Sequence, residues 1–236
     1  QDAGFISKTL SSLYIGGCSA GSIGTQLWAK TVWEMFPSEH AAIAPDSYAG
    51  VFPQEAEGPL IRGFGFCGAD ILPSVLKPEC LRGELKIQSI NLLNMHHVND
   101  IPFTFINSKR DSTQMAFYYA IAVTTNTTMG KGAHLTAAEY YDGVNQLFGA
   151  YANEPNFAAY LVDGANHCFT NKALYYDANP LSHTGSIPSK KEHMVDWVNG
   201  LETAEVDEVP VVCAGPAQET DPNSPPVYCD ESYAVE

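Results

Sequence analysis

Positive charge is scarce in this sequence. Its 236 residues include 12 lysines and arginines against 27 aspartates and glutamates, which gives a formal net charge of −15 at pH 7. Such an acidic surface repels nucleic acid, anionic lipid head groups and polyanionic polymers. The composition therefore predicts no nucleic-acid partner, and the charge itself is explained by solubility alone.

Long apolar runs are also missing. No stretch reaches the about 18 consecutive apolar residues that a transmembrane helix needs, so we expect no transmembrane segment. Hydrophobic residues still make up 45% of the chain and charged residues 17%, a balance typical of a core-forming globular domain. The sequence begins at Gln1 without an initiator methionine, so we expect a mature protein or a fragment of one.

Cysteine is sparse but even in number. None of the six cysteines stands in a Cys-x-x-Cys or Cys/His ligand pattern, so we expect neither a metal nor another cofactor. Cys67 with Cys80, and Cys213 with Cys229, flank loop-rich stretches and are candidate disulfides of an oxidising compartment. Asn126, in Asn-Thr-Thr, is a candidate glycosylation site. These features predict a protein that is secreted or resides in the secretory pathway or at the cell surface.

A glycine-flanked serine is the most informative stretch. An apolar strand runs into Gly17-Cys18-Ser19-Ala20-Gly21, and a helical pattern over 22–36 follows at once. This is the Gly-x-Ser-x-Gly pattern of a nucleophile elbow, in which glycines on both sides leave room for a serine with positive φ. The pattern predicts an exposed Ser19 hydroxyl at a helix N-terminus, with the Ala20 N–H facing a developing oxyanion. A glycine-rich turn without chemistry is the alternative.

Strands and helices alternate along the rest of the chain. Strands are expected over 40–43, 101–107 and 157–162, and helices over 114–124, 137–151 and 190–201. This alternation predicts an α/β fold with a parallel sheet and flanking helices. We expect residues 1–208 to form that domain, with 1–12 as a polar lead-in and 54–100 as a cap-like insertion. The acidic, proline-rich residues 209–236 are expected to form a disulfide-pinned tail.

Three strand ends carry the residues of a serine hydrolase. Ser19, Asp111 and His167 follow successive predicted strands, in the chain order Ser…Asp…His that is typical of α/β-hydrolases. In this interpretation His167 takes the proton of Ser19, and Asp111 fixes the imidazole tautomer. Each residue also has a simpler explanation: Asp111 suits the N-cap of the next helix, and a lone histidine after a strand is often structural.

Two other chemistries are less favoured. Cys18 as a thiol nucleophile conflicts with the elbow, which points that side chain away from the site. A metal site at His96, His97 and Asp100 is less favoured than a pair of histidines at a helix end. If Ser19 and His167 meet in space, the adjacent Cys18 and Cys168 are also brought near each other.

These residues resemble a known family. Four blocks, at residues 17–21, 48–52, 105–114 and 164–169, are similar to the pectin acetylesterase/Notum family. The resemblance implies a secreted α/β-hydrolase-fold carboxylesterase that removes O-acyl groups from a glycan or an acylated protein. It also implies that Ser19 is the nucleophile, Asp111 the acid, His167 the base and Ala20 an oxyanion-hole donor.

The chain also departs from the family pattern. Ser22 stands where the family has a second glycine, and the family has an aspartate near the position of Tyr48. Only 18 residues precede Ser19, whereas the family places about half of its sheet before a central elbow strand. Because one strand-helix-strand unit needs about 30 residues, we expect the N-terminal strands to be missing. The elbow strand would then be completed by the protein's own N-terminal half or another chain. A non-catalytic scaffold or assembly subunit is the alternative function.

Overall fold

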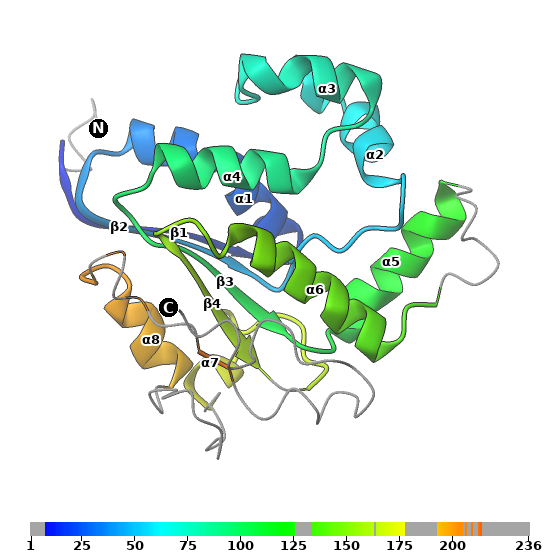
Figure 1. Cartoon of the computed structure of the whole chain (residues 1–236). Helices are drawn as coiled ribbons and strands as arrows, with labels where there is room; N and C mark the ends of the chain where they lie inside the picture. Colours follow the sequence, from blue (N-terminus) through cyan, green and yellow to red (C-terminus); the bar gives the residue numbers. More distant parts are fainter. Residues whose placement is uncertain are drawn as a thin grey trace.

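A parallel sheet forms the centre of the molecule. The computed structural model describes residues 8–125, 134–162, 164–177, 193–204, 206, 209 and 212–213. Its strands lie in the order β1-β2-β3-β4-β5, and every pair of neighbours is parallel (Figure 1). The strands are β1 (Leu10–Cys18), β2 (Ser38–Asp46), β3 (Phe103–Ser108), β4 (Phe157–Val162) and the two-residue β5 (Val212–Cys213). The predicted α/β class with a parallel sheet is confirmed.

Helices cover both faces of this sheet. The longer ones are α1 (Ala20–Met35), α4 (Ile87–His97), α5 (Ser112–Thr124) and α6 (Ala137–Tyr151). The shorter ones are α2 (Glu57–Gly63), η1 (Phe66–Gly68), η2 (Ser74–Leu76), α3 (Lys77–Arg82), α7 (Leu174–Asp177) and α8 (Met194–Gly200). Helices α1, α4 and α6 lie over one face and α8 lies over the other (Figure 1). Within the described residues, none of the helices combines the length and hydropathy needed to cross a bilayer.

The inner strands are buried on both faces. Phe105 of β3 packs its ring against Phe148 and Tyr151 of α6, with centroid distances of 5.2 and 5.7 Å. On the opposite face, Tyr160 of β4 contacts Trp197 of α8 at 5.3 Å. Strands that are covered on both faces consist almost entirely of apolar residues. Their sequences therefore lack the alternation of apolar and polar residues seen in half-exposed strands, but they do indicate burial.

Strand β1 lies at the edge of the described sheet. It pairs with β2 from Leu10 to Cys18, and no other described strand pairs with it. Ile15 is buried against the helices, whereas Tyr14 on the opposite face is 38% exposed. The family resemblance predicts a central strand here, and the described residues place the elbow strand at an edge instead. The existence of further strands beyond β1 stays a prediction.

Several predicted boundaries need correction. Residues 10–12 belong to β1 rather than to a lead-in, because parallel pairing with β2 already begins at Leu10 opposite Ser38. Strand β2 reaches Asp46, three residues beyond its predicted end. The last helix is described from Met194, and residues 190–192 lie outside the described part of the chain.

Residues 54–100 form a series of short helices followed by α4. A disulfide between Cys67 and Cys80 links η1 to α3. Helix α4 packs against α1 and, through Met95, on the main core. A cap role for this segment and a domain boundary at residue 208 stay predictions. Asn126 and Cys229 lie outside the described residues, so the structure leaves the glycosylation site and the pairing of Cys213 as expectations.

Candidate active site

Ser19 occupies a strained turn between β1 and α1. Its φ is 59° and its ψ is −116°, a conformation that residues other than glycine rarely adopt. The Ser19 N–H donates to the carbonyl oxygen of Asp46 at 3.0 Å, and the Ser22 N–H donates to the Ser19 carbonyl oxygen at 2.9 Å. Although Ser19 is the N-cap residue, its side chain makes no capping hydrogen bond. The hydroxyl is therefore not committed to the helix.

The two flanking glycines have different roles. A Cβ added at Gly17 would lie 2.6 Å from the carbonyl oxygen of Gly21, closer than packed atoms tolerate. A Cβ added at Gly21 would meet no atom within 4 Å. The prediction that the turn needs glycine on both sides is therefore right for Gly17 and wrong for Gly21. The crowding arises where the start of α1 presses on residue 17, so only the earlier glycine is required.

Ala20 is the first residue of α1. The first N–H groups of an α-helix have no acceptor within the helix. The Ala20 N–H is thus placed directly after Ser19 at the positive end of the helix dipole, as the elbow pattern predicts.

Asp111 and His167 form a hydrogen-bonded pair. His167 Nδ1 lies 2.8 Å from Asp111 Oδ2, and the Asp111 side chain is fully buried. Asp111 Oδ1 also accepts from the backbone N–H groups of Thr113 and Gln114, at 3.0 and 2.9 Å. Asp111 therefore has both contacts that its two explanations require. Oδ1 caps the N-terminus of α5, and Oδ2 accepts a hydrogen bond from the imidazole of His167.

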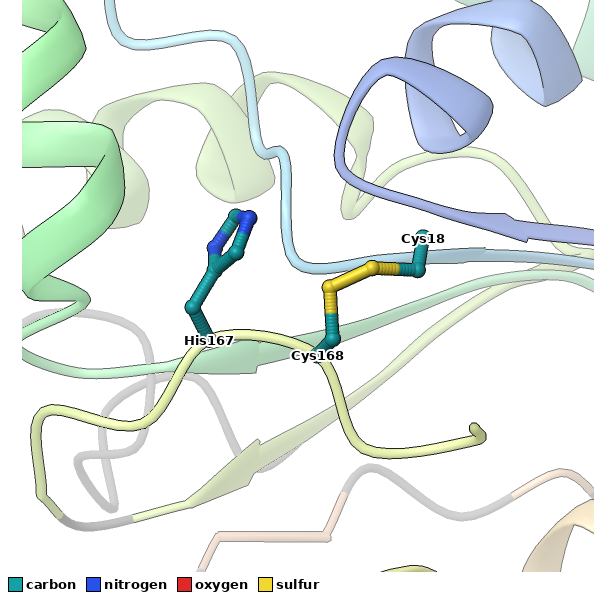
Figure 2. A group of neighbouring side chains, drawn as sticks. All are labelled: Cys18, His167 and Cys168. Atoms are coloured by element: carbon teal, nitrogen blue, oxygen red, sulfur yellow. A yellow bond between two sulfur atoms is a disulfide. The ribbon is translucent and has the colours of Figure 1, made fainter. Parts of the chain in front are cut away.

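The second ring nitrogen of His167 is buried and has no hydrogen-bond partner among the described residues. A ring nitrogen of His167 lies within 4.8 Å of the sulfur atoms of Cys18 and Cys168. Figure 2 shows the imidazole beside the bond between these sulfurs. Because Cys18 directly precedes Ser19, the fold brings the imidazole to the elbow. The structure pairs Asp111 with His167 but forms no hydrogen bond from Ser19 Oγ to His167 Nε2.

A disulfide joins Cys18 to Cys168. It links the residue before Ser19 to the residue after His167. The bond leaves Cys18 without a thiol, so the chemistry of a cysteine nucleophile does not apply here. Among the described residues, one group has the spacing of metal ligands: Cys18, His167 and Cys168. The disulfide uses both of its sulfur atoms. His97, in the other suggested metal site, lies with its Nε2 3.1 Å from Glu34 Oε1.

Gln114 is a residue that the sequence reasoning missed. Its Nε2 donates to Asp111 Oδ2 at 2.9 Å and to Asn107 Oδ1 at 2.7 Å. Its Oε1 accepts from the backbone N–H of Ala49 at 3.0 Å. Gln114 thereby fastens the loop after β2 to the carboxylate of Asp111. The available signal was its place three residues after a predicted N-cap aspartate, within reach of that side chain.

Asp46 is the second missed residue. It ends β2, is fully buried, and accepts hydrogen bonds from the loop that carries His167. An acidic residue directly after the apolar run 41–45 was the available signal, and the predicted strand ended at residue 43, before reaching it.

A cleft of about 790 Å³ is lined by the loop after β2, the start of α2 and one face of α6. Its lining includes Glu57 and Gln146 but none of Ser19, Asp111 and His167. Glu57 is buried, and burial raises its pKa to about 7. Its Oε1 accepts from the Ile87 N–H at 2.6 Å, at the start of α4. Capping this helix is a sufficient structural reason for the buried carboxyl group.

No family model matches the chain, and no curated protein matches it significantly. The family resemblance therefore rests on the four sequence blocks alone, and the functional argument rests on the geometry around Ser19 and His167.

Proposed function

We propose that this protein is a serine carboxylesterase, similar to the pectin acetylesterase/Notum family, that removes O-acyl groups from a glycan or an acylated protein. The observation that carries the proposal is the hydrogen bond between His167 and the fully buried carboxylate of Asp111, beside the positive-φ elbow of Ser19. A purely structural histidine would not need a buried carboxylate bonded to one ring nitrogen. Nor would its second ring nitrogen need to lie buried, without a partner among the described residues, close to a serine of positive φ.

The reaction needs one proton carrier and one oxyanion donor. His167 Nε2 takes the hydroxyl proton of Ser19 as Oγ bonds to the acyl carbon, and the carbonyl π electrons become an oxyanion facing the Ala20 N–H. The oxyanion collapses, the ester C–O bond breaks, and the leaving alkoxide takes the proton from His167. Water then attacks the acyl-enzyme by the same route, releasing the carboxylic acid and restoring Ser19.

Asp111 keeps the imidazole in the tautomer that this cycle requires. Asp111 Oδ2 accepts from the Nδ1–H of His167 at 2.8 Å, which leaves Nε2 as the proton acceptor. The first step also needs a hydrogen bond from Ser19 Oγ to His167 Nε2, and such bonds are often long before substrate binds.

Two disulfides among the described residues fit an extracellular or secreted protein. We place the enzyme accordingly in the secretory pathway or outside the cell. We also propose that the free edge of β1 is completed by the protein's own N-terminal half or by another chain. The support is a nine-residue strand with one unpaired edge among the described strands. The unpaired backbone N–H and C=O groups along such an edge can hydrogen-bond to another strand.

A non-catalytic scaffold is the second candidate. The observation that favours it is the absent hydrogen bond between His167 and Ser19 in the described residues.

Hydrolysis of p-nitrophenyl acetate separates the two candidates. We expect the wild-type protein to hydrolyse this ester, and Ser19→Ala to lose at least about a thousandfold in kcat/KM. Asp111→Asn is expected to lose about ten-thousandfold, because the imidazole then adopts the wrong tautomer. Ser112→Ala, next in the chain and exposed, is the matched control and retains activity. A wild-type rate equal to that of Ser19→Ala favours the scaffold.

A further inference from the structure

Asp46 lies between the two halves of the proposed site. It is the last residue of β2, and its Cα is in register with Cys18 on β1 and with Ile106 on β3. Its side chain is fully buried. A buried carboxylate is costly unless hydrogen bonds compensate it, so its partners indicate why it is there.

The partners of the carboxylate belong to the loop after His167. Asp46 Oδ2 accepts from the backbone N–H groups of Phe169 and Thr170 and from the Thr170 hydroxyl, each at 2.8 Å. Asp46 Oδ1 accepts from the hydroxyl of Ser47 at 2.6 Å, and that hydroxyl accepts from the Cys168 N–H at 2.9 Å. Three consecutive N–H groups directly after His167 are thus held, two by the carboxylate and one through Ser47.

The backbone of the same residue holds the nucleophile. The carbonyl oxygen of Asp46 accepts from the N–H of Ser19 at 3.0 Å. One residue therefore binds the serine through its main chain and the histidine loop through its side chain.

From these contacts we propose that Asp46 is a positioning residue, which sets the approach of His167 to Ser19. The inference rests on the proposed esterase function, since only that reaction requires the two side chains to meet. Asp46 does not touch the reacting atoms. It acts by fixing the loop that carries the base relative to the elbow that carries the nucleophile.

The contacts require a carboxylate in particular. A carboxylate only accepts hydrogen bonds and has about four acceptor positions, and here four donors occupy it. Asparagine has the same shape but replaces one acceptor by an NH₂ donor and removes the charge that strengthens the remaining bonds. The Cys18–Cys168 disulfide still ties the two segments covalently, so we expect Asp46→Asn to fold while losing the exact placement of the loop.

Kinetics of Asp46→Asn test this role. We expect kcat for p-nitrophenyl acetate to fall about tenfold to hundredfold, the scale of effect of a displacement of about 1 Å, with KM changed by less than about twofold. The rate of Ser19 modification by a fluorophosphonate should fall by the same factor. Ser112→Ala is the matched control, because it removes a different hydrogen bond to the same loop, from Ser112 Oγ to the carbonyl oxygen of Ala165. It should stay within about twofold of wild type.

The outcomes separate this inference from the esterase proposal. An active wild type with an unimpaired, folded Asp46→Asn variant overturns the positioning role and leaves the esterase intact. An inactive wild type overturns both. If Asp46→Asn does not fold, Ser47→Ala decides, because it removes the hydroxyl that links Asp46 Oδ1 to the Cys168 N–H and leaves the three hydrogen bonds to Asp46 Oδ2 in place. A threefold to tenfold loss in kcat is then expected, and an unchanged kcat contradicts the role.

Discussion

Cys18 and Cys168 are bonded to each other across 150 residues of chain. Each lies next to a residue of the proposed catalytic pair, Ser19 or His167. The same two segments are joined a second time without covalent bonds, through Asp46, which accepts from the Ser19 N–H and from the loop after His167. The elbow and the histidine loop are therefore held together by a covalent link and by a hydrogen-bonded one.

We expect the Cys18–Cys168 bond to contribute more to stability than the Cys67–Cys80 bond. The first closes a loop of 150 residues and the second a loop of 13. In the chain-entropy account these loop lengths correspond to about 5 and about 3 kcal/mol. Denaturant unfolding of the two double-alanine variants measures the difference. Equal losses, or a larger loss at Cys67–Cys80, would show that native contacts rather than loop closure decide the effect.

Replacing each of the two elbow glycines by alanine should change the free energy of unfolding in opposite directions. Gly17→Ala places a methyl group 2.6 Å from the Gly21 carbonyl oxygen, and we expect a loss of about 2 kcal/mol or more in the free energy of unfolding. Gly21→Ala meets open space in the first turn of α1, and removing a helical glycine should gain up to about 1 kcal/mol. Thermal or denaturant unfolding checks both. A destabilised Gly21→Ala variant would mean that the first turn of α1 is not placed as described.

Glu57 should make stability fall as the pH rises. Burial raises its pKa from 4.5 to about 7, so between these values the folded protein binds more protons at this group than the unfolded chain does. The neutral carboxyl group therefore favours folding at low pH. Its ionisation costs up to about 3 kcal/mol by pH 8, because each pKa unit corresponds to about 1.4 kcal/mol.

The matched variants for this effect are Glu57→Gln and Glu84→Gln. The first removes the titrating group but keeps an oxygen for the Ile87 N–H, so it should exceed wild type in stability at pH 8 and equal it near pH 4. The second changes an exposed carboxylate of the same cleft and should leave the pH profile unchanged. If Glu57→Gln keeps the wild-type slope, Glu57 does not titrate in this range.

Local patterns predicted the elements well where the signal lies within one segment. Helix α6 and strand β4 have their predicted bounds, and α6 begins with a capping box in which Thr136 and Glu139 bond each other's backbone N–H groups. The strand ending at Asp46 was predicted too short, because its first residues are exposed and its last two are a proline and an acid. Contacts such as Asp46 to Thr170, 124 residues apart, leave no mark on a local pattern.

The pairing of Asp111 with His167 was predictable for a different reason. In a parallel α/β sheet the carboxyl ends of strands converge on one edge, so residues far apart in sequence can be grouped by topology alone. This reasoning places Asp111 and His167 together, as the structure does. Asp46 was missed because the predicted strand stopped at residue 43, and Gln114 was missed because it lies in the first turn of α5 rather than at a strand end.

Covalent labelling with a fluorophosphonate tests the central claim most directly, because the reagent reacts with a serine only when a base activates it. Mass spectrometry of the labelled native protein should find about one label per chain, on Ser19, and His167→Ala should remove it while leaving the protein folded. A wild-type protein that stays unlabelled, or a label that persists unchanged in His167→Ala, would contradict the account.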